Sequence, residues 1–355
     1  SKEHDMSKTR CYSIDLYKLI LSLIIVALHF NWQFVPQGYL AVETFFLISG
    51  FFSALNKKKT EQNSLFSLCL NKFKKIYPIY ALMIIIWAIV VFFVYQNTDL
   101  VKQLPAYLSM FYAFTTKGTG YNYIGYLGYL WFIPVYFLCY IVIAFISKNL
   151  DRQKSTFACL VTAVLSASLL VYFSESGGLN YSIEDLAPVH TGVLQGLMDM
   201  SIGYIAGMLG QEAKTRLGSE RKLYQVLVCT IFELLGVLYS LFVVSANVSV
   251  LYDYSYIIVS AALIVLFDLN IGLIGRAMDR IASLKYMRYL TGASMSLYMV
   301  HGLVINLYKL CSDQDSSERG FLICVGISIL AALLLEILDK LFQNKVMAKL
   351  AAVQK

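Results

Sequence analysis

Repeated apolar runs of about 20 residues constrain the fold of this chain more than any other feature, because each is long enough to cross a bilayer as a helix. Of the 355 residues, 58% are hydrophobic and 14% are charged, and the mean hydropathy is +0.65. We therefore predict an all-α polytopic membrane protein with one membrane domain over residues 1–355. The ten predicted transmembrane helices cover 12–32, 38–56, 76–95, 126–147, 156–173, 190–209, 222–244, 253–270, 289–310 and 320–341.

The basic residues predict how these helices are oriented. With both termini in the cytoplasm, all but five of the 29 Lys and Arg residues fall in cytoplasmic segments, as the positive-inside rule requires. The net charge of +7 follows from this topology and needs no nucleic-acid partner. None of the seven cysteines has a CxxC or Cys/His spacing that indicates a metal, so no metal site is expected. The shorter apolar segment 103–115 is expected to be interfacial or re-entrant.

Polar residues share one face of the first predicted helix: Asp15, Lys18, Ser22 and His29. Lys18 and His29 are eleven residues apart, which returns them to nearly the same face and separates them by roughly 16 Å along the helix axis. Ionisable groups at membrane depth are costly and usually functional. This stripe therefore predicts a functional surface, with an ammonium group near the cytoplasmic end and an imidazole near the outer end.

Glu43 enters the second predicted helix at nearly the depth of His29. A carboxylate at that depth can orient the imidazole and raise its basicity, as in general-base catalysis. The alternative is a buried polar pair that only fixes helix packing. The pattern thus makes His29 and Glu43 the candidate catalytic pair.

Three lysines precede the third predicted helix, and two of them, Lys72 and Lys75, are candidate ligands for a phosphorylated cytosolic molecule together with Lys18. The alternative is ordinary anchoring at the cytoplasmic surface. On the ninth predicted helix, Tyr298 and His301 share a face with Ser294, where His301 either joins helices or takes part in catalysis.

Aromatic residues cluster before and within the fourth predicted helix, and Trp131 is the candidate site residue among them. They form either an interfacial belt or a platform on which a sugar stacks. Two acidic residues, Asp199 and Glu233, lie deep enough to line a cavity, and the sequence assigns them no role. The aromatic cluster consists of Tyr121, Tyr123, Tyr126, Tyr129 and Trp131.

Five segments together resemble the membrane-bound acyltransferase-3 superfamily, whose first signature is Arg or Lys, ten residues, and His. The resemblance covers essentially the whole chain, and its first two motifs are the specific ones. The matching segments are 13–18 (SIDLYK) with His29, 38–51 (GYLAVETFFLISGF), 72–78 (KFKKIYP), 131–134 (WFIP) and 296–301 (SLYMVH).

The resemblance implies a ten-helix fold in a bacterial plasma membrane. It implies transfer of an acyl group, usually acetyl from acetyl-CoA, to an extracytoplasmic sugar of the cell envelope. It also implies that His29 is catalytic, that Lys18 stands where the family more often has arginine, and that Lys72 and Lys75 lie near the CoA entrance. Lysines replace the arginines that are commoner there, which keeps the charge but loses the bidentate geometry, and Gln195 occupies a position where arginine is common.

The expected partners are therefore acyl-CoA, a carbohydrate acceptor and the lipid bilayer. Asp15, Ser22, Trp131, Tyr298 and His301 are expected to be substrate-binding or structural residues. A small-molecule transporter, similar to the membrane domain of membrane-anchored serine racemases, is the alternative function. A scaffold or sensor would gain nothing from charges at membrane depth. The sequence leaves open whether the chain forms a homodimer.

Overall fold

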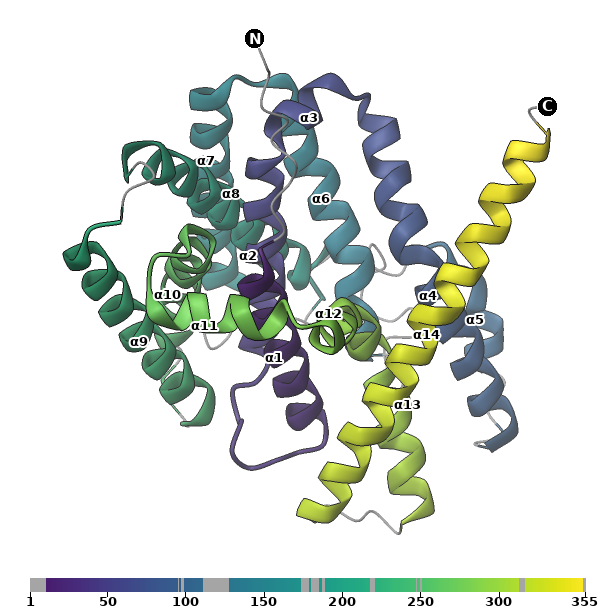
Figure 1. The fold of residues 1–355 in the computed structure, drawn as a ribbon. Coiled ribbons are helices and arrows are strands. Elements are labelled where there is room, and N and C mark those ends of the chain that lie inside the picture. Colours follow the sequence, from purple (N-terminus) through teal and green to yellow (C-terminus); the bar gives the residue numbers. More distant parts are fainter. Residues whose placement is uncertain are drawn as a thin grey trace.

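The computed structural model describes residues 11–94, 96, 99–110, 128–173, 179, 185–186, 189–217, 221–246, 248–249, 251–312 and 317–353. Helices account for nearly all of this part and pack into one bundle (Figure 1). A short antiparallel pair, β1 (Asp185–Leu186) and β2 (Val189–His190), precedes α8. The helices are α1 (Tyr12–His29), α2 (Leu40–Leu55), α3 (Lys57–Gln62), α4 (Leu65–Val94), α5 (Asp99–Leu108), η3 (Gly128–Trp131), α6 (Phe132–Asn149), α7 (Arg152–Phe173), α8 (Thr191–Leu217), α9 (Leu223–Ser245), α10 (Leu251–Leu269), α11 (Leu273–Ala282), α12 (Lys285–Gly292), α13 (Ser294–Cys311) and α14 (Glu318–Val353).

Each of the ten ranges predicted to cross a membrane contains helix, but the helices differ in their ability to span one. Within the described residues, seven are long and apolar enough: α1, α4, η3 with α6, α7, α9, α10 and α14. The predicted span 289–310 is broken, because α12 and α13 meet at a bend of 60°. The structure therefore has seven candidate spans, or eight if the bent pair crosses as one, where the sequence predicted ten.

The remaining two predicted spans, α2 and α8, lie inside the bundle. α2 has only 16 residues, and α8 packs against α2, α6, α7 and α10. By contrast, only 11% of the apolar window of α9 is buried. A helix surrounded by other helices can carry polar groups that its neighbours satisfy, so it needs no continuous apolar surface for lipid.

Glycines bring the backbones of α2 and α8 into direct contact. A Cβ atom added at Gly50 would lie 1.9 Å from the carbonyl oxygen of Met200, and one at Gly203 would lie 2.0 Å from the carbonyl oxygen of Leu47. Small residues permit such close approach between membrane helices. This contact fixes the rotation of α2 and thereby the direction in which Glu43 faces.

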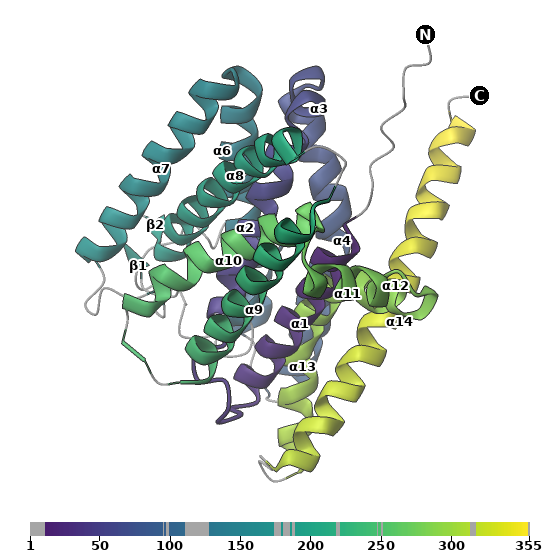
Figure 2. The ribbon, with the colours of Figure 1, turned by 60° about the vertical axis from the view of Figure 1, so that its left-hand side comes forward.

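α1 and α13 run side by side in the same direction (Figure 2). The hydroxyl of Ser22 lies 3.0 Å from the carbonyl oxygen of Ser294, and the ring centroids of His29 and His301 are 4.9 Å apart. Ser22 and His29 are seven residues apart on α1, and Ser294 and His301 are seven residues apart on α13. Both spacings are about two helical turns. The two helices are therefore parallel and in register, so the end of α1 is placed against the middle of α13.

The segment 103–115, predicted to be interfacial or re-entrant, falls partly in α5, while residues 111–127 lie outside the described residues. α5 is tied to α4 by the hydroxyls of Tyr77 and Tyr80, which donate hydrogen bonds to the carbonyl oxygens of Leu108 (3.0 Å) and Tyr107 (2.8 Å). Among the aromatic cluster of the sequence, the tyrosines from 121 to 126 also lie outside the described part of the chain.

Candidate active site

His29 is the last residue of α1, and the preceding turn holds its ring. Its Nδ1 atom lies 3.0 Å from the carbonyl oxygen of Ile25. A carbonyl oxygen can only accept, so Nδ1 carries the proton and the neutral ring presents Nε2 as a base. The side chain is exposed, and within the described residues Nε2 has no hydrogen-bond partner. The turn thus leaves a basic nitrogen accessible.

His301 of α13 and Tyr129 of η3 pack around His29. Ring centroids are 4.9 Å apart for His29 and His301, 4.9 Å for Tyr129 and His301, and 6.2 Å for His29 and Tyr129. His301 is fully buried, with Nδ1 2.6 Å from the carbonyl oxygen of Tyr298, and its Nε2 has no partner in the described part of the chain. We call these three rings, His29, Tyr129 and His301, the histidine cluster.

Tyr129 is held in the cluster by contacts on both sides. Its hydroxyl accepts a hydrogen bond from Nε1 of Trp87 at 2.7 Å and donates one to the carbonyl oxygen of Met299 at 3.1 Å. The hydroxyl of Tyr298 donates to the Tyr129 carbonyl oxygen. Gly302 permits this arrangement, since a Cβ atom there would lie 2.2 Å from the Tyr129 ring. The predicted residues Tyr298 and His301 therefore both reach the cluster.

Lys18, Lys72 and Lys75 gather around the start of the polar stripe on α1. Lys75 lies within electrostatic range of the other two lysines and of Glu336 on α14. The ammonium of Lys18 is already 2.5 Å from the carboxylate of Asp15. Lys75 is exposed and forms no ion pair within 4 Å among the described residues. Of the three, Lys75 is therefore the cation most available to a ligand.

Lys72 is positioned by aromatic rings. Its Nζ atom lies 5.0 Å from the ring centroid of Tyr136 and 4.8 Å from that of Tyr140, both on α6. Such contacts favour a cation over the ring face. The hydroxyl of Ser49 donates a hydrogen bond of 3.2 Å to the Tyr136 hydroxyl, which connects this group to α2. The two rings thus position the ammonium of Lys72, whereas among the described residues the ammonium of Lys75 has no such ring contact.

Glu43 does not contact His29. It is buried, and its carboxyl group interacts electrostatically with the carboxyl group of Asp199, which is buried as well. No hydrogen bond joins His29 and Glu43 in the described part of the chain; Ile25 orients the imidazole instead. The predicted pairing of His29 with Glu43 is therefore wrong. The sequence position of Glu43 gives its depth, but the contact between α2 and α8 turns the Glu43 side chain towards Asp199.

The other candidate residues are distributed between the two regions. Asp15 neutralises Lys18, and the hydroxyl of Ser22 shares its hydrogen bond between the carbonyl oxygens of Lys18 and Ser294, both at 3.0 Å. Trp131 packs against Phe46 of α2, with ring centroids 6.3 Å apart. Asp15 and Ser22 therefore shape the stripe, whereas Trp131 packs on the α2 side.

Sequence reasoning placed Tyr129 in an interfacial belt or a sugar-stacking platform, and it gave Asp199 no role. The spacing of seven residues from Ser22 to His29 recurs from Ser294 to His301, and this shared spacing was a signal that α1 and α13 could pack in parallel. It would have predicted the contact between the two histidines. Glu336 accepts a hydrogen bond of 2.7 Å from the hydroxyl of Ser296, a contact that no local pattern announces.

Residues 12–337 match a family described as an acyltransferase domain. The matched region begins with α1 and extends well into α14, so it contains both the histidine cluster and the three lysines. No curated protein and no solved structure matches the chain.

Proposed function

Because the chain belongs to the acyltransferase-3 family, we propose that it moves an acyl group, with acetyl as the first to test, from cytosolic acyl-CoA to a hydroxyl of an extracytoplasmic envelope sugar. The family match and the apolar helices make it a multi-pass membrane acyltransferase; the donor, the acceptor and a bacterial plasma membrane are the proposed part. The observation that carries the proposal is the accessible Nε2 of His29 on the same helix as the lysine group.

The donor would enter at the lysines. The positive-inside pattern supports a cytoplasmic position for this end of α1, where CoA is available. Lys75 and Lys72 would bind the CoA phosphates as point charges, and Lys18 would assist if a phosphate displaces Asp15. The thioester end would extend along α1 towards His29, roughly 16 Å away by helix geometry.

His29 would act as a general base at the other end of this path. Nε2 removes the proton of the acceptor hydroxyl as its oxygen attacks the acyl carbon, and the bond from carbon to sulfur breaks. The proton then passes from Nε2 to the departing CoA thiolate, so atoms and charge balance. The Ile25 carbonyl keeps the proton on Nδ1 throughout and therefore keeps Nε2 directed to the reaction.

Binding of acetyl-CoA to detergent-purified protein tests the donor site. We expect Lys75→Ala to weaken binding by about 10- to 100-fold, the effect of one hydrogen bond to a charged group, and Lys72→Ala to act in the same direction. Lys18→Ala should have the smallest effect of the three, because its charge is already paired. Isothermal titration with acetyl-CoA, free CoA and desulfo-CoA measures these affinities.

Lys154→Ala is the matched control, since among the described residues this exposed lysine pairs only with Asp151 in the same turn. It should bind acetyl-CoA as the unmodified chain does. If Lys75→Ala and Lys154→Ala bind acetyl-CoA with equal affinity, the lysine group does not form the donor site. No binding of acetyl-CoA by the unmodified chain would overturn the proposed donor itself.

Glu43→Gln is expected to retain most acyl transfer, because Glu43 is an electrostatic neighbour of Asp199 and makes no hydrogen bond with His29 among the described residues. The amide has the size of the carboxyl group and can donate to the Asp199 carboxylate, so it is a close substitute. Glu43→Ala should instead open a cavity beside the buried Asp199 and cost about 1–3 kcal/mol of stability. Thermal unfolding and initial rates measure both effects. A folded Glu43→Gln protein with strongly reduced transfer would restore a catalytic role for Glu43.

Transport is the second candidate, and the bend between α12 and α13 favours it. Broken helices are typical of binding sites in transporters, and the 60° break lies directly before Ser294, which contacts the stripe on α1. Uptake of labelled serine into liposomes tests this function. Serine uptake by a protein that does not bind acetyl-CoA would support transport. Measurable acyl transfer without serine uptake would exclude transport.

A further inference from the structure

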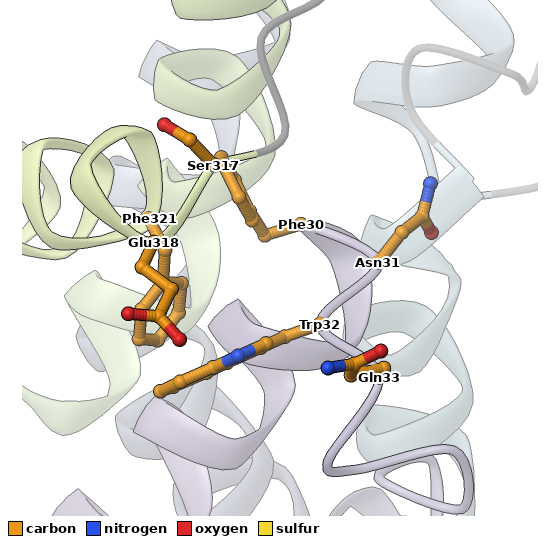
Figure 3. A pocket seen from close by; sticks show the side chains of 7 residues that line it. All are labelled: Phe30, Asn31, Trp32, Gln33, Ser317, Glu318 and Phe321. Atoms are coloured by element: carbon orange, nitrogen blue, oxygen red, sulfur yellow. The ribbon is translucent and has the colours of Figure 1, made fainter.

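A pocket of about 300 Å³ opens beside the end of α1, at the opposite end of that helix from the lysines (Figure 3). Residues 30–33 line one side and the start of α14 lines the other. The rings of Phe30 and Phe321 are buried and that of Trp32 is half-buried, so Trp32 is the aromatic ring that a ligand can reach. Asn31, Gln33 and Glu318 are exposed at its edge.

The backbone that presents Trp32 is held by hydrogen bonds. The amide of Asn31 donates to the carbonyl oxygen of Leu28 and that of Trp32 donates to Ala27, both at 2.9 Å. Asn31 has φ of 66°, the left-handed conformation expected where this pair of bonds ends a helix. The Trp32 ring also packs on Phe321 with centroids 3.8 Å apart. The indole is therefore placed by local structure and not by a loop free to move.

The polar groups at the edge are available to a ligand. The side chains of Gln33 and Glu318 have no hydrogen-bond or ionic partner among the described residues. In Figure 3 the indole of Trp32 extends towards Glu318 and Phe321, with Gln33 on its other side. Amides donate and accept while a carboxylate accepts, so hydroxyl groups are suitable partners for both. Among the lining residues Glu318 alone is charged. The ammonium of Lys309 lies 5.5 Å from the Phe30 ring centroid, but Lys309 does not line the pocket. The carboxylate at the edge therefore favours a neutral ligand over an anionic one.

We propose that this pocket binds a neutral sugar ring of the acceptor, stacked against Trp32 and hydrogen-bonded by Gln33 and Glu318. One accessible aromatic ring with polar groups around it can orient a small polar ligand. The proposal rests on the proposed transfer to a sugar and adds where the sugar is held and that it is neutral. We expect phosphorylated sugars and uronic acids to bind more weakly than neutral sugars, because the Glu318 carboxylate repels them.

The pocket lies close enough to His29 to position a hydroxyl there. Trp32 follows His29 by three residues, which bounds the distance between their Cα atoms at about 11 Å. A ring held on Trp32 can therefore extend a hydroxyl group, or a neighbouring sugar unit, towards Nε2 of His29. The donor would reach the same nitrogen from the lysines, so the two substrates approach it from opposite ends of α1.

Tryptophan fluorescence in the absence of any acyl donor tests the site. The chain has three tryptophans, and the other two, Trp87 and Trp131, are buried. Titration with methyl glucoside and methyl N-acetylglucosaminide should give a saturable change, and Trp32→Phe should remove it. Glucuronic acid should give none. The titration extends to about 0.1 M, where even binding with a Kd of about 10 mM is nearly saturated.

Variants that keep Trp32 as the reporter measure the polar contacts. We expect Glu318→Ala to weaken sugar binding by about tenfold and Gln33→Ala by about fivefold. Gln153→Ala, an exposed glutamine at the start of α7, is the matched control and should bind normally. Full affinity in Glu318→Ala, or tighter binding of glucuronic acid than of the neutral sugars, would overturn the proposal.

The outcome is separable from that of the proposed function. Saturable sugar binding without acetyl-CoA binding would support the pocket and remove the transferase mechanism. Acetyl-CoA binding without any sugar response would keep the transferase and overturn the pocket. In an active protein, Glu318→Ala should raise KM for the sugar more than it lowers kcat, whereas an equal loss of sugar and acetyl-CoA affinity would indicate misfolding and count against the assignment.

Discussion

Replacing His29 by alanine is expected to lower acyl transfer by about 10²- to 10⁴-fold, the usual contribution of a positioned general base. The physical reason is the arrangement of its ring: the Ile25 carbonyl holds the proton on Nδ1, and Nε2 is left exposed without a partner. No other base in the histidine cluster is equally placed, since His301 is fully buried. Initial rates of acetyl transfer to a sugar acceptor measure the loss.

Two controls separate catalysis from folding in this experiment. The His29→Ala protein should bind acetyl-CoA with unchanged affinity, because the lysines lie about three turns away along α1. Added imidazole should restore part of the rate, because the exposed side of His29 leaves an opening for a small base. A folded His29→Ala protein that transfers acetyl at the original rate would show that another group removes the proton.

The polar stripe of α1 was predictable from sequence because it depends on one helix alone. Two principles are enough to predict that Lys18 and His29 lie on one functional face: the helical period and the cost of charge at membrane depth. The exact end of α1 needed more: the sequence suggested 32, but Asn31 takes a left-handed conformation that ends the helix at His29. The end matters, because it places Trp32 in the pocket and not on a further turn.

Contacts between helices were less predictable, and Glu43 shows why. Rise per residue gives the depth of a side chain, but its direction depends on rotation about the helix axis, which packing sets. Gly50 and Gly203 determine that rotation here, so Glu43 meets Asp199 and not His29. A hydropathy pattern likewise cannot distinguish a helix inside the bundle, such as α8, from one that faces lipid.

Replacing Gly50 by alanine is expected to destabilise the protein by about 3 kcal/mol or more, at the upper end of overpacking effects. The added Cβ atom would lie 1.9 Å from the carbonyl oxygen of Met200. The obstacle is backbone, which no change of rotamer can move, so α2 and α8 would have to separate. Separation would move Glu43 away from Asp199. It would also disturb Ser49, whose hydroxyl donates a hydrogen bond to Tyr136 beside Lys72. Thermal unfolding in detergent and acetyl-CoA binding measure the two consequences.

Gly326→Ala is the matched control, because the same atom is added to a glycine of α14 that has nothing within 4 Å of the new Cβ. Alanine is the better helix former by about 0.5–1 kcal/mol, so this variant should be as stable as the original chain or slightly more stable. The same substitution should thus lower the stability at position 50 and leave it unchanged or raise it slightly at position 326. If Gly50→Ala unfolds at the same temperature as Gly326→Ala, then α2 and α8 are not in backbone contact, and the direction of Glu43 that follows from that contact is wrong as well.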